Sequence, residues 1–553
     1  MSGLPANGQP WPLSGNAERY ARMPRQDAWY SGDPARLAAV YGGAAAGGSS
    51  NGPPTTLNPS GTVKAVIGAV RSAFWASRST GEEADTRLHL PTPEDIARHS
   101  ARLLFSERLN VRVIGPVHEA DGPKDAAGEF TFRKGGPKPE TVAAQARLDK
   151  ILGLCKFDAL LLAAAEISSA LGSTGLRIAF NKDGPISDRP MIARVDADAT
   201  LPVYSWGQLV GVMFWQVVLH DANGVIWRHI EMHEGGKVYH GLYKGDNGTL
   251  GDRQELTANA ATERLKVDAE GAITLLRDGG LTATSIPNML PDPMDRRNNA
   301  GRSDFTPTVM GLFDTIDRVF TQMMDSIEDA KSRLLVSESM LEKGKPGQGK
   351  TFDQNQRIFT SLKVPPPEKE GGGLPIEKVQ FEMHVQEYLQ AIDWLVRQAI
   401  QAAGYSPGTD VGTAGRDVTA TEILDDKADD MATRDVKIRY WQPELQALLT
   451  SFVAVDVAEF APRDETGKLI QAYPVEVTFA DAIQPAKLEL ATVAKALKEA
   501  GAASIFSLVS TVNPEWDATT IGIEVDRILE EAGFVDPATF GMAGAGVGPG
   551  DGV

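Results

Sequence analysis

The chain has 553 residues, of which 42% are hydrophobic and 23% charged, so it is long enough to bury more than one sizeable core. Its 73 acidic residues outnumber its 55 basic residues, and the formal net charge is −18. A protein that grips nucleic acid by its phosphates is expected to be basic. The balance therefore argues against tight, sequence-independent DNA binding, although it is compatible with an acidic wall along which DNA slides without sticking.

A single cysteine, Cys155, excludes an intramolecular disulfide and any zinc site built from several cysteines. It lies in an apolar helical context, which predicts a buried, inert thiol, and the composition fits a reducing cytosol. Residues 1–20 lack the apolar core of a signal peptide. The most apolar stretch, 160–165, is far too short to span a bilayer. We expect a soluble protein or a part of a soluble assembly.

Residues 1–62 are rich in Gly, Pro and Ala and also carry aromatic residues, namely Trp11, Tyr20, Trp29, Tyr30 and Tyr41. Aromatic residues in such an arm predict a tail that docks on something, such as a neighbouring subunit. A partly ordered leader is the alternative interpretation.

Helical patterns follow this arm at 62–75 and 93–105, and the second begins with a Thr cap and a Pro in its first turn. A further helix is predicted across 141–171, ending at Gly172. The period then changes, and short runs of Val, Ile and aromatic residues across 175–280 predict an antiparallel β region. Within it, the sequence DANG at 221–224 indicates a hairpin. Residues 287–303 are expected to form a loop.

A long helix with two different faces is predicted across 308–341. Its apolar side chains recur at three-and-four spacing: Phe313, Ile316, Phe320, Met323, Met324 and Ile327. Acidic side chains recur at the same spacing on the opposite face: Asp314, Asp317, Asp325, Glu328 and Asp329. The apolar face needs a packed neighbour, and the acidic face favours water or repels an anionic partner.

A second helix is predicted at 382–402, followed by a polar Gly/Thr loop at 404–418 and a third long helix from Thr419. The residues between the first two helices, 343–378, are polar, Pro/Gly-rich and locally basic. They predict a small exposed module at the tip of a helical hairpin.

The third helix opens with a capping box, Thr419 to Glu422, and Pro443 is expected to kink or break it just after Trp441. Residues 473–479 predict a strand. Residues 485–533 predict two or three short helices, with stops at Gly501 and Gly533, and the tail 541–553 is expected to be disordered.

The residues Gly344 to Thr351 satisfy the phosphate-binding loop pattern G-x-x-x-x-G-K-[ST]. That chemistry needs a buried strand before the loop and a helix after it, so that backbone N–H groups cradle phosphates. Here the preceding residues are helical and charged in pattern, and no clear amphipathic helix follows. We therefore interpret the segment as a flexible basic loop and not as an NTPase site.

Two further patterns are weak. Asp196-Ala-Asp198-Ala-Thr200 matches the pattern of aspartyl-phosphate enzymes, but those need a parallel sheet, whereas the surroundings predict an antiparallel one. His229, Glu231 and His233 alternate along a predicted strand, with His240 nearby in the sequence. A metal site is conceivable there, but the spacing is not His-Glu-x-x-His, so an exposed strand face is the default and we assign no metal, no cofactor and no catalytic residue.

The order of these elements resembles the portal, or head-to-tail connector, proteins of tailed bacteriophages. The resemblance rests on six loose patterns in the family's order, which together cover most of residues 27–530: DAWYSGDPARLAAVYGG at 27–43, RLHLPTPEDIARHSARLLFSERLNV at 87–111, WRHIEMHEGGKVYHGLYKGD at 227–246, IDRVFTQMMDSIEDAKSRLLVSESML at 316–341, EYLQAIDWLVRQAIQAAGYSPGTDVG at 387–412 and TATEILDDKADDMATRDVKIRYWQPELQALL at 419–449. The stretch 344–375 and the C-terminal tail do not match.

The resemblance implies an α+β fold with an α/β wing, a helical stem, a small α/β clip, a long channel helix and a helical crown. The corresponding boundaries are an N-terminal arm at 1–62, a wing at 63–302, stem helices at 303–341 and 381–403, a clip at 342–380, a tunnel loop at 404–418, a channel helix with a return strand at 419–482, a crown at 483–540 and a tail at 541–553.

The resemblance also implies a function that is not enzymatic: a dodecameric ring at one capsid vertex, through which a terminase packages double-stranded DNA. The DNA later leaves by the same channel. The implied partners are other copies of the chain, the major capsid protein, the terminase large subunit, head-to-tail adaptor proteins and a scaffold protein, with no membrane. The implied location is the virion, after assembly in the host cytoplasm. An NTPase that uses Lys350 and a different ring-forming head–tail adaptor are the alternatives.

In such a ring, part of the acidic face at 314–329 is expected to line the channel and lower friction on the DNA. A solvated outer face with ordinary pairs to Arg318 and Lys331 is the equally weighted alternative. The tunnel loop contributes Thr409, Asp410, Thr413 and Arg416, of which Arg416 is the candidate for a transient phosphate contact. Lys345 and Lys350 in the clip would meet the terminase or an adaptor protein.

Overall fold

The computed structural model describes residues 3–13, 15–42, 88–117, 137–221, 224–277, 279–329, 333–336, 342–343, 350–351, 376–379, 384–407, 428–479, 487–513 and parts of 521–528. The chain forms two compact units, 1–479 and 480–553. Among the described residues, no helix is long and apolar enough to cross a membrane. The helix expected at 62–75, the capping box at 419–422, Gly533 and the tail 541–553 lie outside the described residues.

The N-terminal arm docks on its own chain. It forms helices α1 (Ala17–Ser31) and α2 (Pro34–Gly42), and Trp29 of α1 is fully buried. The ring of Trp11 packs edge-on against Trp215 at a centroid separation of 5.0 Å, and the Tyr243 hydroxyl donates to the Pro5 carbonyl at 2.7 Å. The expectation of a docking arm is thus confirmed for the described part of the arm, which docks on its own chain, and residues 43–62 lie outside the described residues.

Three helices lead from the arm into the sheets: α4 (Thr92–Phe105), α5 (Pro139–Leu154) and α6 (Phe157–Leu171). The expected Thr cap is wrong, because α4 begins at Thr92 itself and Pro91 holds the cap position. The single helix expected at 141–171 is also wrong, because Lys156 adopts a left-handed φ of 51° and separates α5 from α6. The predicted stop at Gly172 is confirmed: its φ is 93°, and a Cβ there would lie 2.8 Å from the Ser303 amide nitrogen.

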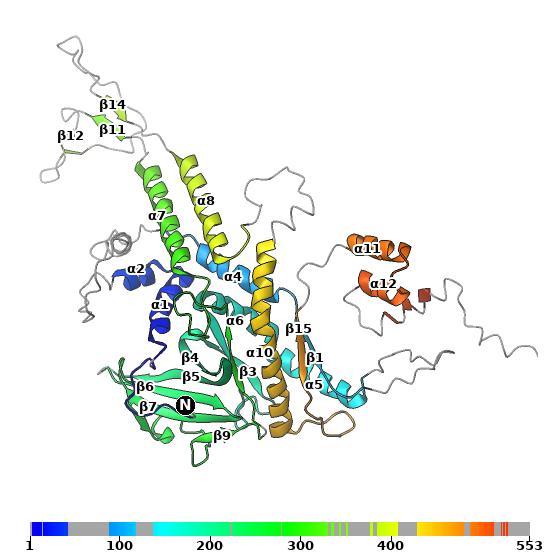
Figure 1. Ribbon diagram of the computed structural model, residues 1–553. Coiled ribbons are helices and arrows are strands. Elements are labelled where there is room, and N and C mark those ends of the chain that lie inside the picture. The colour runs from blue at the N-terminus through cyan, green and yellow to red at the C-terminus, as the bar shows by residue number, and fades with distance from the viewer. Residues whose placement is uncertain are drawn as a thin grey trace, which may run out of the picture. The chain divides into compact units, whose positions relative to one another are not determined.

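The antiparallel β region is confirmed (Figure 1). One sheet has the order β10–β2–β3, built from β2 (Ser173–Ala179), β3 (Met191–Asp196) and β10 (Ala283–Pro287). The other has the order β4–β5–β6–β7–β8, with β9 paired to β7. Its strands are β4 (Thr200–Ser205), β5 (Gln208–His220), β6 (Ile226–Glu234), β7 (Lys237–Gly245), β8 (Asp252–Gln254) and β9 (Ala272–Thr274), and short 3-10 turns occupy Ala197–Ala199 and Leu256–Ala258.

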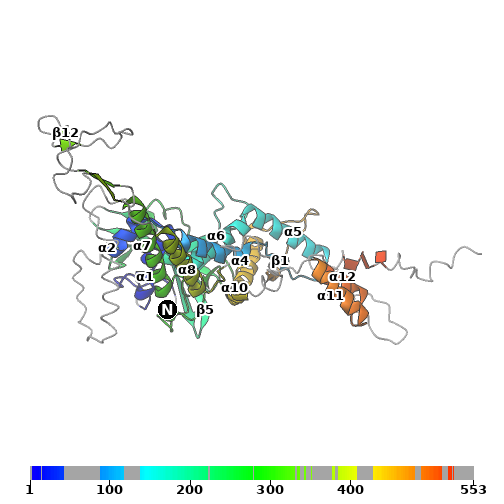
Figure 2. The same ribbon diagram turned by 90° about the horizontal axis from the view of Figure 1, so that it is seen from above.

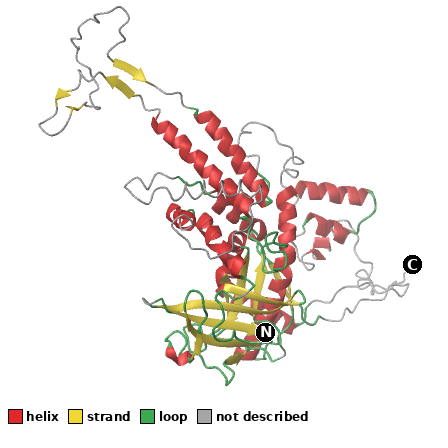
Figure 3. Cartoon of the chain, turned by 60° about the vertical axis from the view of Figure 1, so that its left-hand side comes forward, coloured by secondary structure: helices red, strands yellow, loops and turns green. Residues whose placement is uncertain are grey.

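The predicted hairpin joins β5 to β6, where the Asp221 amide donates to the Val225 carbonyl and Gly224 has a φ of 79°. Val212 and Phe214 of β5 pack on Ala283 of β10, so the two sheets share a small apolar cluster. Figure 3 shows the strands of both sheets gathered away from the paired helices α7 and α8.

Helices α7 (Pro307–Asp329) and α8 (Val385–Ala403) lie side by side (Figure 2). The second helix confirms the prediction to within three residues at its start, but the first ends 12 residues before the predicted Leu341. Instead, β11 (Arg333–Val336) pairs antiparallel with β14 (Ile376–Val379), and β12 (Glu342–Lys343) pairs with β13 (Lys350–Thr351). Pairing with a distant strand satisfies the backbone hydrogen-bonding groups of 333–336, and this outweighs the helical pattern of the local sequence.

Helix α10 (Ala428–Phe460) is continuous through Pro443, where we expected a kink or a break. Pro443 is exposed, whereas Trp441, Leu445 and Phe452 are buried on the face that packs into the core. Packing on both sides of the proline therefore outweighs the one backbone hydrogen bond that it cannot donate. The predicted strand at 473–479 is confirmed as β15 (Val475–Thr478), which pairs with β1 (Asn110–Val113).

The second unit contains α11 (Lys487–Glu499) and α12 (Ile505–Val512), as the prediction of short helices required. The Gly501 amide donates to the Lys498 carbonyl at 3.1 Å, with a φ of 65°, and this confirms the predicted stop. The Ser504 hydroxyl caps α12 by accepting from the Ser507 amide at 3.2 Å.

Candidate functional site

Two of the five acidic residues predicted to line a channel are buried within the chain. Asp314 is 1% exposed and accepts from the Arg318 guanidinium at 2.7 Å. Asp317 is also 1% exposed, with its carboxylate 2.8 Å from His89 Nδ1 and accepting from the Leu90 amide at 3.0 Å. Burial raises the pKa of Asp317, against the opposing effect of His89. The burial of both carboxylates within the chain argues against Asp314 and Asp317 as lining residues, because His89 and Leu90 contact Asp317 and Arg318 pairs with Asp314.

Asp325, further along the acidic face of α7, differs from Asp314 and Asp317 in its exposure to solvent. Asp325 is exposed, and Glu328 and Asp329 belong to α7 although their side chains lie outside the described structure. Of the predicted apolar stripe, Phe313, Ile316 and Met323 are buried and Phe320 and Ile327 are half-buried, whereas Met324 is exposed, so the stripe is confirmed except at Met324. Sequence periodicity thus identified both faces, but only the last turns of α7 leave an acidic side chain free.

The other predicted DNA and partner contacts lie mostly outside the described residues, namely Thr409, Asp410, Thr413, Arg416 and Lys345. The start of the 404–418 loop is nevertheless defined. Gly404 ends α8 with a φ of 92°, and the Ser406 amide donates to Asp430 Oδ1 at 2.8 Å. The loop therefore leaves from a fixed junction between α8 and α10.

The phosphate-binding pattern does not have the geometry that its chemistry needs. Lys350 and Thr351 form β13 and pair with Lys343 and Glu342, whereas in a phosphate-binding loop these positions open a helix. The side chain of Lys350 lies outside the described structure. The interpretation of 344–351 as a loop without NTPase chemistry agrees with this strand pairing.

The histidine-rich strand is buried, so the expectation of an exposed face is wrong. His229, His233 and His240 are 4%, 1% and 6% exposed. His229, Glu231 and His233 alternate along β6, and His240 lies opposite Glu231 on β7. The face is covered because Arg177 reaches it from β2 and forms an ion pair with Glu231.

These side chains lie within contact distance of one another. His229 Nε2 is 3.2 Å from His240 Nδ1, and the two rings are nearly parallel, with an interplanar angle of 12° and centroids 5.3 Å apart. Glu231 Oε1 lies 3.9 Å from His229 Nδ1, and Glu231 Oε2 lies 3.9 Å from His233 Nε2. His233 Nδ1 is 2.8 Å from the Thr282 hydroxyl. We call His229, Glu231, His233 and His240 the histidine cluster.

The electrostatics of the histidine cluster favour neutral rings beside an anionic carboxylate. Burial lowers the pKa of His240 to about 4 and also lowers the pKa values of His229 and His233. Burial alone would raise the pKa of Glu231, but His233, Arg177 and the other two rings together lower it well below its usual range. At neutral pH the three imidazoles are therefore free to act as lone-pair donors.

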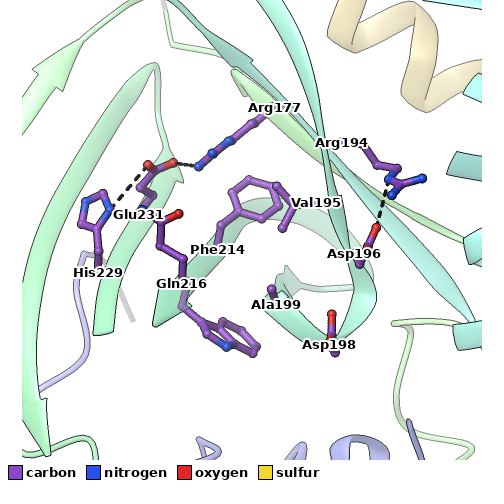
Figure 4. Close-up of a pocket in the computed structure, with 11 residues that line it drawn as sticks. Arg177, Arg194, Val195, Asp196, Asp198, Ala199, Phe214, Gln216, His229 and Glu231 are labelled. Carbon is purple, nitrogen blue, oxygen red and sulfur yellow. Dashed lines mark hydrogen bonds and ion pairs between the residues drawn. The ribbon is translucent and has the colours of Figure 1, made fainter. Parts of the chain in front are cut away.

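A cavity of about 320 Å³ opens beside this cluster, and His229, Glu231 and Arg177 form part of its wall (Figure 4). On its other side Arg194 Nε lies 3.0 Å from Asp196 Oδ1, and burial together with Asp196 raises the pKa of Asp198. Asp196 is the last residue of β3 and Asp198 lies in the turn after it, and because β3 is antiparallel to β2, the context of an aspartyl-phosphate enzyme is absent from these strands. Sequence spacing gave no signal for Arg177, because it lies on a distant strand.

Of three comparisons with known proteins, the family model alone identifies a family. No curated protein matches the chain. Among solved structures, the chain is similar to one described as "Neck of native GTA particle computed with C12 symmetry", with 13% identity, a TM-score of 0.31, and 68% of this chain and 88% of that chain covered. The family model described as "Phage portal protein, SPP1 Gp6-like" matches residues 81–533, most of the 553-residue sequence. The chain therefore belongs to the SPP1 Gp6-like family of phage portal proteins.

Proposed function

We propose that twelve copies of this chain form a ring at a unique capsid vertex, and that double-stranded DNA passes through the bore of the ring. The portal family consists of structural virion proteins that assemble with copies of themselves and with capsid and neck proteins. The observation that carries the proposal is the family match across 81–533, which includes both helices of the α7–α8 pair.

The proposed channel wall is the last part of α7. Asp325 is exposed, and Glu328 and Asp329 follow at the same helical spacing. Repeated around a ring, carboxylates at this level would repel DNA phosphates and lower friction, because like charges disfavour close contact. Asp314 and Asp317 have no part in this wall, since both are buried against their own chain.

We further propose contacts with DNA in the tunnel loop and with other proteins in the clip. Arg416 is the basic residue of the tunnel loop and is proposed to touch phosphates transiently. Lys345 and Lys350 are proposed to meet the terminase large subunit during packaging and the adaptor proteins afterwards. The ring is further proposed to join the major capsid protein, with a scaffold protein, during assembly in the host cytoplasm, and to release DNA during infection.

The test of the ring is native mass spectrometry and negative-stain imaging of the purified full chain. Twelve subunits around a central hole support the proposal, whereas a stable monomer or dimer contradicts it. An ATPase assay on the wild type and Lys350→Ala tests the alternative hypothesis that the chain is an NTPase. We expect no ATP hydrolysis that depends on Lys350.

The channel roles need a packaging assay with purified terminase. We expect Asp325→Lys to slow DNA packaging, since it places a ring of positive charge against the phosphates, and Arg416→Ala to reduce it. The matched control is Asp252→Lys on β8, an exposed carboxylate far from α7 in the sequence. Normal packaging by both variants would overturn the proposed lining and the proposed phosphate contact.

A further inference from the structure

We propose that His229, Glu231 and His240 form a binding site for a divalent cation of the zinc class. One donor atom of each of these three side chains lies within 4.8 Å of the donor atoms of the other two. The donors come from the adjacent strands β6 and β7, so one ion would link the two strands directly.

The spacing of the two rings suits a small tetrahedral ion. Ligand atoms about 2.0–2.1 Å from a tetrahedral zinc ion are roughly 3.3 Å from each other. His229 Nε2 and His240 Nδ1 are 3.2 Å apart. Without an ion, this contact requires one of the two buried nitrogens to carry a proton toward the other. With an ion, both nitrogens use their lone pairs, which is the form that neutral imidazoles offer.

Glu231 is the third proposed ligand, and its carboxylate is positioned by Arg177. Arg177 forms an ion pair with Glu231 through Oε2, while Oε1 lies 3.9 Å from His229 Nδ1, on the same ring whose Nε2 faces His240. Ligating carboxylates are commonly held by an outer partner in this way. The guanidinium also adds a positive charge, so the anionic Glu231 must offset it for a cation to bind. Two imidazoles with one carboxylate are a donor set that zinc uses with a fourth, solvent position.

The cluster is reachable in spite of its burial. His229 and Glu231 line the 320 Å³ cavity, which gives an ion a route and gives a water molecule room at the fourth position (Figure 4). A further imidazole nitrogen lies at the same face: His233 Nε2 is buried and has no hydrogen-bond partner among the described residues.

The experiment uses the full chain after removal of metals with a chelator. We expect cobalt to bind with one equivalent per chain and to give the visible absorption of a four-coordinate site, and we expect zinc to displace it. His229→Gln and His240→Gln should each lose this equivalent. The matched control is His220→Gln on β5, an exposed histidine outside the cluster, which should bind as the wild type does.

Far-UV circular dichroism and gel filtration show whether each variant folds. Should the glutamine variants fail to fold, X-ray absorption of the zinc-loaded wild type decides the question, because the proposed site requires two imidazoles among the ligands. A wild type that takes up no cobalt, a His240→Gln variant that binds as the wild type does, or a zinc shell without imidazole would overturn the proposal. Metal uptake by the chain is measured independently of ring assembly.

Discussion

Lys437 and Asp304, which are 133 residues apart in the sequence, form an ion pair with Nζ 2.8 Å from Oδ2. Their side chains are 1% and 3% exposed. Lys437 also donates to the Ser100 hydroxyl at 2.7 Å, and the Tyr405 hydroxyl donates to Asp304 at 2.8 Å. Burial lowers the pKa of Lys437 and Asp304 opposes that effect. The pair thus joins α4, α10, the end of α8 and the segment before α7 at one buried point.

Removing one partner of this pair should be costly. Lys437→Met leaves the Asp304 carboxylate buried without its cation, and breaking such a pair costs about 3–5 kcal/mol. The exposed control is Lys468→Met, whose pair with Glu140 involves side chains 61% and 35% exposed. We expect that change to stay within about 1 kcal/mol. Urea unfolding of the two variants measures the difference.

The double variant Lys437→Met with Asp304→Asn is the internal check on that explanation. Replacing the remaining carboxylate by a neutral amide should recover part of the lost free energy of unfolding, because the large term is an uncompensated charge. Equal stability of Lys437→Met and the Lys468→Met control would contradict the assigned role of the pair.

Asp317 and Asp325 should differ in what they contribute, although both belong to the acidic face of α7. Asp317→Ala leaves the partly buried Leu90 amide without its acceptor, and the loss of the acceptor of a buried donor costs about 1–3 kcal/mol. Asp325→Ala removes an exposed side chain and should change stability by less than about 0.5 kcal/mol. Thermal unfolding of both variants tests this, and a destabilised Asp325→Ala would show that the exposed position has a structural contact.

The contrast between these two aspartates also shows where sequence reasoning succeeds. The spacing of Phe313, Ile316 and Met323 predicts a helix with one buried face, because apolar periodicity reports directly on local geometry. It carries no information on which remote segment covers the other face. Residues 88–90 do so for Asp317, more than 200 positions away in the sequence.

The same limit of sequence reasoning explains why the burial of the histidine cluster was not predicted. Alternation along β6 correctly predicts that His229, Glu231 and His233 share one face of a strand. The burial of that face depends on Arg177 and the sheet it belongs to, which the alternation does not specify. Two predictions failed for the opposite reason, because they relied on local propensity alone. Packing keeps the helix intact at Pro443, where a break was predicted, and strand pairing replaces the helix that was predicted at 333–336.

Cys155 should react slowly with alkylating reagents. Its thiol is half-buried, Sγ lies 3.9 Å from the Pro190 carbonyl, and burial raises its pKa. The thiolate is the reactive species, so a raised pKa means less of it at neutral pH and a rate that continues to climb above about pH 8.5. Iodoacetamide labelling followed by mass spectrometry from pH 7 to 10 measures this. Labelling at pH 7 as fast as that of a small free thiol would contradict it.

Trp206 should destabilise the hairpin at which it lies. It is 99% exposed and adopts a φ of 51°, and the next residue, Gly207, has a φ of 79°. Such a turn between β4 and β5 favours Asn or Gly, because a larger side chain at positive φ costs roughly 1–2 kcal/mol. Trp206→Asn loses no buried surface, so we expect it to raise the free energy of unfolding by about 1 kcal/mol.

Trp206→Val is the matched control and should lower the free energy of unfolding, because a branched Cβ is less favourable at this φ. Thermal unfolding should therefore rank Asn above Trp and Trp above Val, and an Asn variant less stable than the wild type would show that the indole makes a stabilising contact.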